Sequence, residues 1–280
     1  MKQYKWNIAI ILIILVGLSV MLYPDFSSYW NAKNQSKVVA SYNGELNSVK
    51  TEDYEQMWAA AEKYNKDLME LTSPYQNFDL VEGYEEILDI SGTGIMGYLS
   101  IDEIGVEYPV YHGTSEGVLQ IAVGHMQGSS LPTGGAGTHV VLSAHNGLAD
   151  AELFTNLDQL TTGDTFSIVV LDRTLTYQVD QILVVEPHDF SQIQIEEGKD
   201  YCTLITCTPF GVNSHRLLVR GSRVEDTDTE LPAVITEDAR QIGTDMVAAG
   251  IFAFLFILTM PAYISIFYIK RRNQDKRSRK

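Results

Sequence analysis

Cysteine is scarce in this chain, since only Cys202 and Cys207 occur among 280 residues. Both fall in one stretch that is predicted to be a β-strand. Side chains five residues apart on a strand point to opposite faces, with about 17 Å between them along the strand. A disulfide needs Cα atoms within about 7 Å, so we do not expect the two to bridge. We predict that Cys202 is a small buried apolar residue and that Cys207 keeps a free thiol.

Basic residues are also in the minority. The chain holds 20 Lys and Arg against 36 Asp and Glu, for a net charge of −16. Seven of the basic residues lie in the tail 270–280, so the rest of the chain is more acidic than the total suggests. An acidic surface repels phosphate groups. We therefore expect no nucleic-acid partner.

Metal and cofactor motifs are missing as well. No His-x-x-x-His or Cys-x-x-Cys pairing occurs, and the acidic residues are scattered along the chain. The glycine-rich run 134–137 follows Pro132 in a turn-like context, whereas a phosphate-binding loop leads into a helix. The sequence predicts neither a metal site nor a cofactor.

Two long apolar stretches are present, 6–24 and 246–269, and neither contains a charged residue. Each is close to the ~20 residues that a membrane-spanning helix needs. We predict an N-terminal anchor within 1–24, an acidic linker at 225–245, a transmembrane helix at 246–269 and a basic tail at 270–280. Positive charge at both outer ends places both termini in the cytoplasm and the body outside the cell, as a two-pass protein of the cell membrane. The alternative for the first stretch is a cleaved signal peptide, for which the expected small-residue cleavage site is poor.

The segment 25–80 is predicted to be mainly helical, with a helix pattern running from 29 to 71. One apolar face recurs at three- and four-residue steps, which predicts a helix that packs on the body. Its members are Tyr54, Met57, Trp58, Ala61, Asn65, Leu68 and Leu71.

The segment 81–224 reads as short strands separated by glycine-rich turns, which is typical of an antiparallel β-barrel or sandwich. The expected strands are 98–104, 107–111, 139–143, 165–171, 174–185, 201–207 and 216–223. One helical insertion is expected at 151–160, where four apolar residues fall on one face.

Two of these strands are predicted to carry chemistry where they end. One strand ends at Cys207, before a loop with Pro209, and the next begins at Arg216. A cation or histidine beside a cysteine raises its thiolate fraction, and an arginine can stabilise an oxyanion. His145 ends another apolar strand before a glycine turn and supplies a candidate base.

Four stretches around these residues resemble the sortases, the cysteine transpeptidases of Gram-positive cell surfaces, and within them the class C branch that builds pili. They are Thr-Leu-Ile-Thr-Cys at 203–207, Pro-Val-Tyr-His-Gly-Thr at 109–114, Gly-His-Met-Gln-Gly-Ser-Ser-Leu-Pro at 124–132 and Asn-Ser-His-Arg-Leu-Leu-Val-Arg-Gly at 213–221. The resemblance implies an eight-stranded β-barrel in 81–224, with Cys207, His145 and Arg216 as catalytic residues. It also implies substrate contacts from Thr206 and Thr208.

The implied substrate is a Leu-Pro-any-Thr-Gly sorting signal that is cleaved between Thr and Gly through a thioacyl intermediate. The implied acceptor is a lysine amine of another pilin subunit. Two alternatives stay open: a housekeeping sortase that attaches surface proteins to a peptidoglycan precursor, and a non-catalytic adhesion or scaffold domain.

Class C sortases carry a lid in which an Asp-Pro-aromatic plug reaches the active site. Here Ser73, Pro74 and Tyr75 match the proline and the aromatic residue, with serine in place of the acid. An ordinary turn is the alternative interpretation. After His145 the pilus-type pattern has arginine, whereas this chain has Asn146, which we expect to alter the rim of the site.

Other candidates are assigned structural roles. We expect His125 to be a structural hydrogen-bonding residue, with a catalytic role as the alternative, and Arg220 to form a salt bridge. His112, His139 and His188 are expected at ordinary polar positions.

Overall fold

The computed structural model describes residues 2–46, 51–148 and 151–224. The chain divides into two compact units, Met1–Thr227 and Asp228–Lys280, and the second unit lies wholly outside the described residues. The predicted linker at 225–245, the transmembrane helix at 246–269 and the basic tail at 270–280 also lie outside them.

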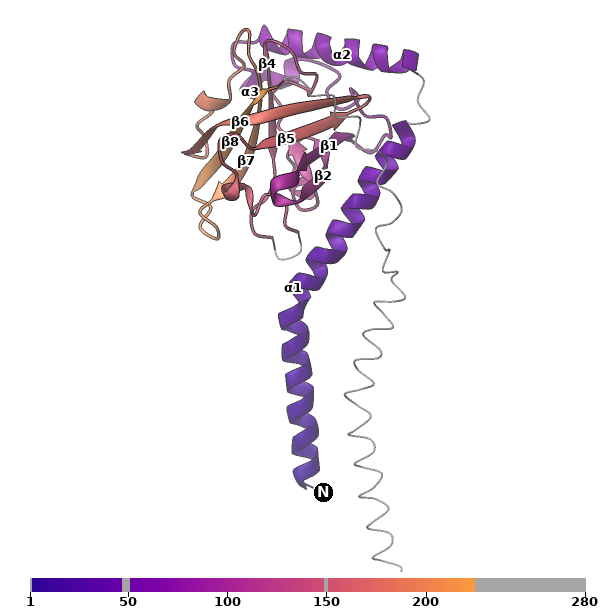
Figure 1. The fold of residues 1–280 in the computed structure, drawn as a ribbon, viewed down its shortest axis with the longest axis vertical. Helices are drawn as coiled ribbons and strands as arrows, with labels where there is room; N and C mark the ends of the chain where they lie inside the picture. Colours follow the sequence, from indigo (N-terminus) through magenta and orange to yellow (C-terminus); the bar gives the residue numbers. More distant parts are fainter. Residues whose placement is uncertain (1, 47–50, 149–150, 225–280) are drawn as a thin grey trace, which may run out of the picture. The chain divides into compact units, whose positions relative to one another are not determined.

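Within the described residues, eight strands form a closed barrel in the order β1-β2-β3-β4-β7-β8-β6-β5 (Figure 1). The strands are β1 (Ile95–Ile101), β2 (Val106–His112), β3 (Val123–His125), β4 (Thr138–Ser143), β5 (Thr165–Val170), β6 (Arg173–Val185), β7 (Asp200–Thr208) and β8 (His215–Arg223). The expected eight-stranded β-barrel is confirmed. It is not purely antiparallel, because β2 pairs in parallel with β3 and β4 pairs in parallel with β7.

Strand β3 was missed from the sequence because it is only three residues long, too short to show alternation. In the structure it is identified by its pairing with β2 and β4. Val123 pairs with Val110 on β2, and His125 pairs with Leu142 on β4. This short strand closes the barrel between its first hairpin and the strand that leads to His145.

The predicted helix at 151–160 is wrong. Leu153 forms an isolated β-bridge with Asn146 and has a φ of 41°, which a right-handed helix does not allow. Only a short 3₁₀ turn, η3 (Leu157–Gln159), follows. Four apolar side chains of the segment are nevertheless buried, namely Leu153, Phe154, Leu157 and Leu160. The turns bring them into the barrel core without a helix.

Alternation along β7 separates the two faces of the barrel wall. Cys202 and Leu204 belong to the interior core, whereas Ile205 packs outside with Val141 and Leu218. Complete burial raises the pKa of the Cys202 thiol well above its usual range. Both cysteines are free, as the sequence predicts.

Two helices precede the barrel, α1 (Lys2–Leu46) and α2 (Thr51–Met69), in agreement with the helical prediction for 29–71. The last part of α1 packs on the barrel through Tyr42. Its hydroxyl donates to Met96 O at 3.1 Å and accepts from Leu171 N at 3.0 Å. Among the described residues, we find no helix with the length and apolar character needed to cross a membrane.

Helix α2 covers the barrel with the apolar face that the sequence predicts. Trp58, Ala61 and Leu68 are buried in the main core, and the Trp58 indole donates to Asp172 Oδ1 at 2.8 Å. Asn65 is buried on the same face. Its side chain donates to Leu131 O at 3.0 Å and accepts from Leu131 N at 2.7 Å, so the helix is hydrogen-bonded to the loop before β4.

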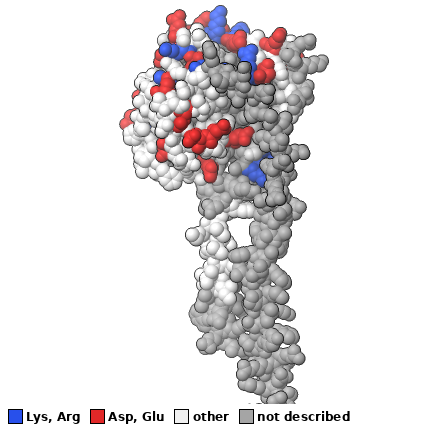
Figure 2. All heavy atoms as spheres, in the orientation of Figure 1, with Lys and Arg blue, Asp and Glu red and all other residues white. Residues whose placement is uncertain are grey.

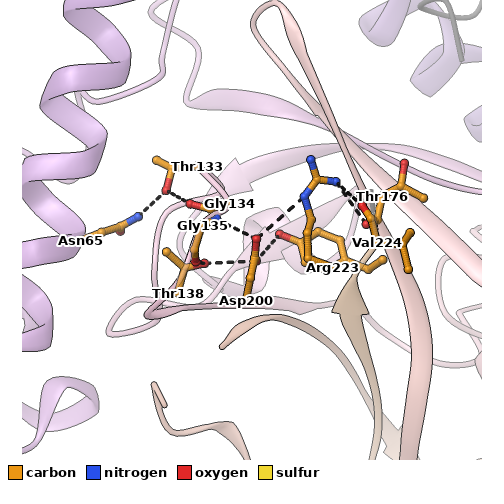
Figure 3. Close-up of polar contacts among 10 residues, drawn as sticks. Asn65, Thr133, Gly134, Gly135, Thr138, Thr176, Asp200, Arg223 and Val224 are labelled. Atoms are coloured by element: carbon orange, nitrogen blue, oxygen red, sulfur yellow. Dashed lines mark hydrogen bonds and ion pairs between the residues drawn. The ribbon is translucent and has the colours of Figure 1, made fainter. Parts of the chain in front are cut away.

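A polar network continues from this helix to the start of β7 (Figure 3). Asn65 also donates to Thr133 Oγ1 at 2.9 Å. Further along, the Asp200 carboxylate accepts from Gly135 N at 2.7 Å and from Thr138 Oγ1 at 3.2 Å, and Arg223 Nε lies 3.8 Å from it. The network ties α2, the 131–138 loop and the ends of β7 and β8 together. It lies at the end of β7 opposite Cys207, about 23 Å away along the strand.

Acidic side chains are spread over the visible face of the body, and many of the visible Lys and Arg side chains gather near the top, where Figure 1 places α2 (Figure 2). The acidic character that the composition predicts is thus exposed to solvent.

Candidate active site

Cys207 and Arg216 lie directly opposite each other on neighbouring strands. β7 and β8 are antiparallel, and the two residues are Cα partners in their register. Directly opposed residues project to the same face of a sheet, about 5 Å apart. Both side chains therefore lie on the outer face of the barrel, and both are half-buried.

The loop that connects these strands gives Arg216 its contacts. Asn213 has a φ of 57° and Gly211 a φ of 75°, so the chain reverses sharply between the strands. One guanidinium nitrogen of Arg216 donates to His215 O at 3.0 Å and to Asn213 O at 3.3 Å. The loop carbonyls thus hold the guanidinium at the turn that follows the strand end with Cys207.

His145 reaches the same place from the other side of β7. Because β4 and β7 are parallel, their carboxyl ends meet at one edge, and Ser143 pairs with Ile205. The ladder continues one residue further, since Ala144 N donates to Ile205 O at 3.2 Å. The chain then leaves β4, and extending its register to His145 sets this residue level with Cys207. The period of two puts both on the outer face with Ser143 and Ile205.

Asn146 links the segment that carries His145 to β7. Its side-chain amide donates to Cys207 O at 3.1 Å, which ties the residue after His145 to the backbone of the cysteine. The sequence predicts only a changed rim at this position, and the contact gives Asn146 a more specific role.

The register thus brings His145, Cys207 and Arg216 into one row across three adjacent strands. Strands lie about 4.8 Å apart, so the backbone positions of His145 and Arg216 lie on either side of that of Cys207. A thiol with a base on one side and a fixed cation on the other can act as a nucleophile toward a carbonyl. The base can protonate the leaving group, and the cation can stabilise an oxyanion.

The two threonines beside the cysteine differ. Thr206 faces the interior and is buried, and its hydroxyl donates to Ala144 O at 2.8 Å. This geometry corrects the expected substrate contact of Thr206, because its hydroxyl instead joins β7 to the segment that carries His145. Thr208 is half-buried at the end of β7, opposite His215. Its expected contact with substrate stays a prediction.

The predicted lid residues lie against the outer face that carries Cys207. Pro74 and Tyr75 begin a short helix, α3 (Pro74–Asn77), which Ser73 precedes without a side-chain capping bond. The Tyr75 ring packs on the outer cluster of Val141, Ile193, Ile205 and Leu218. It also stacks on Phe190 with centroids 5.3 Å apart, and its hydroxyl donates to Ile193 O at 2.6 Å. Burial raises the pKa of this hydroxyl.

Gly128 makes room for this segment. It has a φ of 89°, and a Cβ built on it would lie 2.7 Å from Tyr75 Cα. Only glycine allows the backbone of the predicted lid to approach the barrel so closely.

Three other histidines, His112, His125 and His139, are buried and have structural roles. His125 is completely buried between the Tyr84 hydroxyl at 2.9 Å and Ser130 O at 2.8 Å, and burial lowers its pKa to about 4. His112 and His139 are buried too, which corrects their expected ordinary polar positions. His112 contacts Gly94 O and Ile87 O, at 2.9 and 2.8 Å.

Arg220 forms the predicted salt bridge. Its guanidinium donates to both oxygens of Asp180, at 2.9 and 3.1 Å, and lies over the Tyr201 ring at 4.2 Å. Arg220 is thereby bound to β6 and has a structural role, whereas Arg216 belongs to the candidate active site.

One acidic residue near the row was not found from the sequence. Glu116 Oε1 lies 3.7 Å from His145 Nε2. It belongs to α4 (Glu116–Leu119), a single turn between β2 and β3. Neither its spacing nor its neighbours in the sequence link it to His145, so only the fold reveals the contact. In the described part of the chain, no group of three or more His, Cys, Asp or Glu side chains could hold a metal ion.

Comparison with known proteins agrees with this geometry. The family model described as the sortase domain matches residues 99–224. The structure is similar to that of sortase C from Streptococcus pneumoniae, with 42% identity, a TM-score of 0.61 and coverage of 68% of this chain and 97% of the other. It is also similar to sortase C from Clostridium perfringens with the C-terminal cell wall sorting motif, with 38% identity, a TM-score of 0.59 and coverage of 68% of this chain and 100% of the other.

A third relative is Sortase D of Bacillus subtilis (strain 168), which is 30% identical over 131 residues. That match covers 46% of this chain and 63% of the relative, so the chain spans somewhat less than two thirds of its length.

A closed barrel with a cysteine, a histidine and an arginine in one row across β4, β7 and β8 is the arrangement expected of a cysteine transpeptidase. The chain belongs to the sortase family, and its structural neighbours place it in the class C branch.

Proposed function

We propose that this chain is a membrane-anchored transpeptidase that polymerises pilins. It cleaves a Leu-Pro-any-Thr-Gly-like sorting signal between Thr and Gly and joins the Thr to a lysine amine of another pilin subunit. The observation that carries the proposal is the row of His145, Cys207 and Arg216 on the outer face of the barrel.

In the first half of the reaction, the Cys207 thiolate attacks the Thr carbonyl carbon of the signal. The carbonyl oxygen becomes an oxyanion, which the Arg216 guanidinium stabilises. The C–N bond to Gly then breaks, and His145 gives its proton to the departing amine. The products are a thioester on Cys207 and a peptide that begins with Gly.

In the second half, the lysine amine attacks the thioester carbonyl and loses a proton to His145. The C–S bond breaks, Cys207 leaves as thiolate, and an isopeptide bond joins the two subunits. The protonated imidazole is restored, so one turnover returns both groups to their starting states.

The relatives support the choice of substrates. The Clostridium perfringens sortase C was solved with a cell wall sorting motif, and the Streptococcus pneumoniae sortase C structure was described in terms of pilin substrate specificity. The charge-free stretch 246–269, followed by seven basic residues, supports a membrane location with the barrel outside the cell.

We further propose that Tyr75 acts as the plug of a lid. It packs on the outer cluster of Val141, Ile205 and Leu218, and Ile205 and Leu218 lie two positions from Cys207 and Arg216 on their strands. A sorting signal that uses this face has to displace the ring.

The test compares the two cysteines in the full chain. Incubation with a sorting-signal peptide, followed by mass spectrometry, is expected to detect a thioacyl adduct in the wild type and in Cys202→Ala. The adduct should be absent from Cys207→Ala. If Cys202→Ala is the inactive variant, the assignment of the nucleophile is wrong.

The acceptor is tested by competition between a purified pilin and a peptidoglycan-precursor amine. Preferred transfer to the pilin lysine supports pilus polymerisation, and preferred transfer to the precursor replaces it with surface-protein anchoring. A thiol reagent that labels Cys207 no faster than free cysteine would instead favour a non-catalytic adhesion domain.

A further inference from the structure

A carboxylate lies against the imidazole that the proposed mechanism uses. Glu116 Oε1 is 3.7 Å from His145 Nε2, and the Glu116 side chain is 73% exposed. The carboxylate comes from outside the barrel wall, whereas the cysteine is on β7. The contact therefore sets Nε2 as the ring nitrogen that faces the carboxylate.

The fold holds Glu116 at this place through several contacts of α4. The Ser115 hydroxyl accepts from Val118 N at 3.4 Å and caps the turn, and Gln120 Nε2 donates to Glu116 Oε1 at 3.1 Å. Leu119 anchors the turn on β3, since a Cβ built on Gly124 would lie 3.2 Å from Leu119 Cδ2.

Gly124 is needed for this placement. Its Cβ would also lie 2.5 Å from Gly113 O, in the segment that leads into α4. A larger residue at this position of β3 would push the segment away from the barrel and carry Glu116 away from His145.

We propose that Glu116 is a positioning residue for His145. It holds the ring with Nε2 toward α4 and so sets the orientation of the imidazole relative to Cys207. The inference rests on the proposed function, because it assigns Glu116 through the catalytic role of His145. Glu116 on α4 contacts the imidazole, and the proposed mechanism adds the thiol of Cys207 on β7 and the cation of Arg216 on β8.

The size of the effect of Glu116 depends on the strength of its electrostatic interaction with His145. A carboxylate near an imidazole stabilises the charged form, and a cysteine beside a charged imidazole has a larger thiolate fraction. Because the carboxylate is exposed, solvent and salt screen the interaction. An exposed ion pair of this kind corresponds to a change of about two- to five-fold in an equilibrium.

The experiment measures the rate at which iodoacetamide alkylates Cys207 in the full chain, by mass spectrometry of the peptide that contains it. This readout needs no sorting signal, so it is independent of whether the proposed substrate is right. Rates are measured from pH 5.5 to pH 8, at 0.05 M and 1 M NaCl, for the wild type, Glu116→Gln and Glu116→Asp. The matched control is Glu103→Gln, which removes an exposed carboxylate at the opposite end of β2.

Glu116→Gln is expected to lower the alkylation rate about two- to five-fold near pH 6.5 at low salt, and the difference should shrink at 1 M NaCl. Glu116→Asp should restore part of the rate, and Glu103→Gln should match the wild type. An equal loss in Glu103→Gln would overturn the proposal, since net charge would then explain it. Unchanged alkylation with a raised KM for an amine acceptor would also overturn it, because Glu116 would then bind the acceptor.

Discussion

The Tyr75 ring offers the sharpest test of how the outer face is covered. Besides its apolar packing on the outer cluster, two interactions hold it: the stack on Phe190 at 5.3 Å and the hydrogen bond to Ile193 O at 2.6 Å. An aromatic pair contributes about 1 kcal/mol beyond its burial, and a hydrogen bond about 1 kcal/mol net. Together they favour the covered state by about 2 kcal/mol, or about 30-fold in the equilibrium.

Tyr75→Ala is therefore expected to speed alkylation of Cys207 and cleavage of a sorting-signal peptide, by up to about 30-fold. Tyr75→Phe keeps the stack and loses only the hydrogen bond, so it should give a rise of about five-fold. Both rates are followed in the full chain at one pH. Leu80→Ala, an exposed apolar residue close in sequence, is the control and should leave both rates unchanged.

The relative reaction rates of Tyr75→Ala, Tyr75→Phe and Leu80→Ala show whether the Tyr75 ring limits access to Cys207. If Tyr75→Ala folds normally and reacts at the wild-type rate, Tyr75 does not limit access to the cysteine. If Tyr75→Phe reacts as fast as Tyr75→Ala, the ring stack contributes nothing and the magnitude given above is wrong.

Three further predictions concern the lid, the pH dependence of stability and the attachment of α2. Ser73→Asp should slow cleavage of the signal peptide, because an acid at this position can pair with Arg216 and strengthen closure; a rate equal to or above the wild type would contradict a plug there. His125 has a pKa of about 4 when folded and about 6.5 when unfolded. The unfolded chain therefore binds more protons between these values, and the free energy of unfolding should fall as the pH drops from about 6.5 to 4, by up to about 3 kcal/mol. Urea titrations at pH 7 and pH 4.5 measure it, and a stability that is flat in this range would contradict the assignment. Asn65→Ala should lower the free energy of unfolding by about 2–4 kcal/mol, because it strands the backbone groups of Leu131, while exposed Lys66→Ala should change it little in the same titration.

The local parts of the active site could be predicted from the sequence. Cys207 and Arg216 end and begin two strands joined by a short loop, so their closeness follows from a hairpin alone. The odd spacing of Cys202 and Cys207 likewise predicts one buried and one outward thiol, as the structure has them.

The long-range parts could not be predicted from pattern alone. The parallel pairing of β4 and β7 brings His145 toward Cys207. The alternation of residues within either strand does not indicate which strand it pairs with. The turns at 151–160 place four apolar side chains in the core at spacings that imitate a helix. Glu116 reaches His145 only because the segment around α4 lies close against Gly124.

The site therefore combines two kinds of support. Backbone pairing and the Asn146 bond to Cys207 O set the row of reacting groups, so the closed barrel fixes its geometry. Glu116 and Tyr75 lie outside this wall, on single helical turns that are not part of the barrel's strand pairing. Substitutions at these two positions should therefore change the reactivity and the accessibility of the thiol while the barrel stays folded. This separation makes reactivity and access adjustable without altering the spacing of the three reacting side chains.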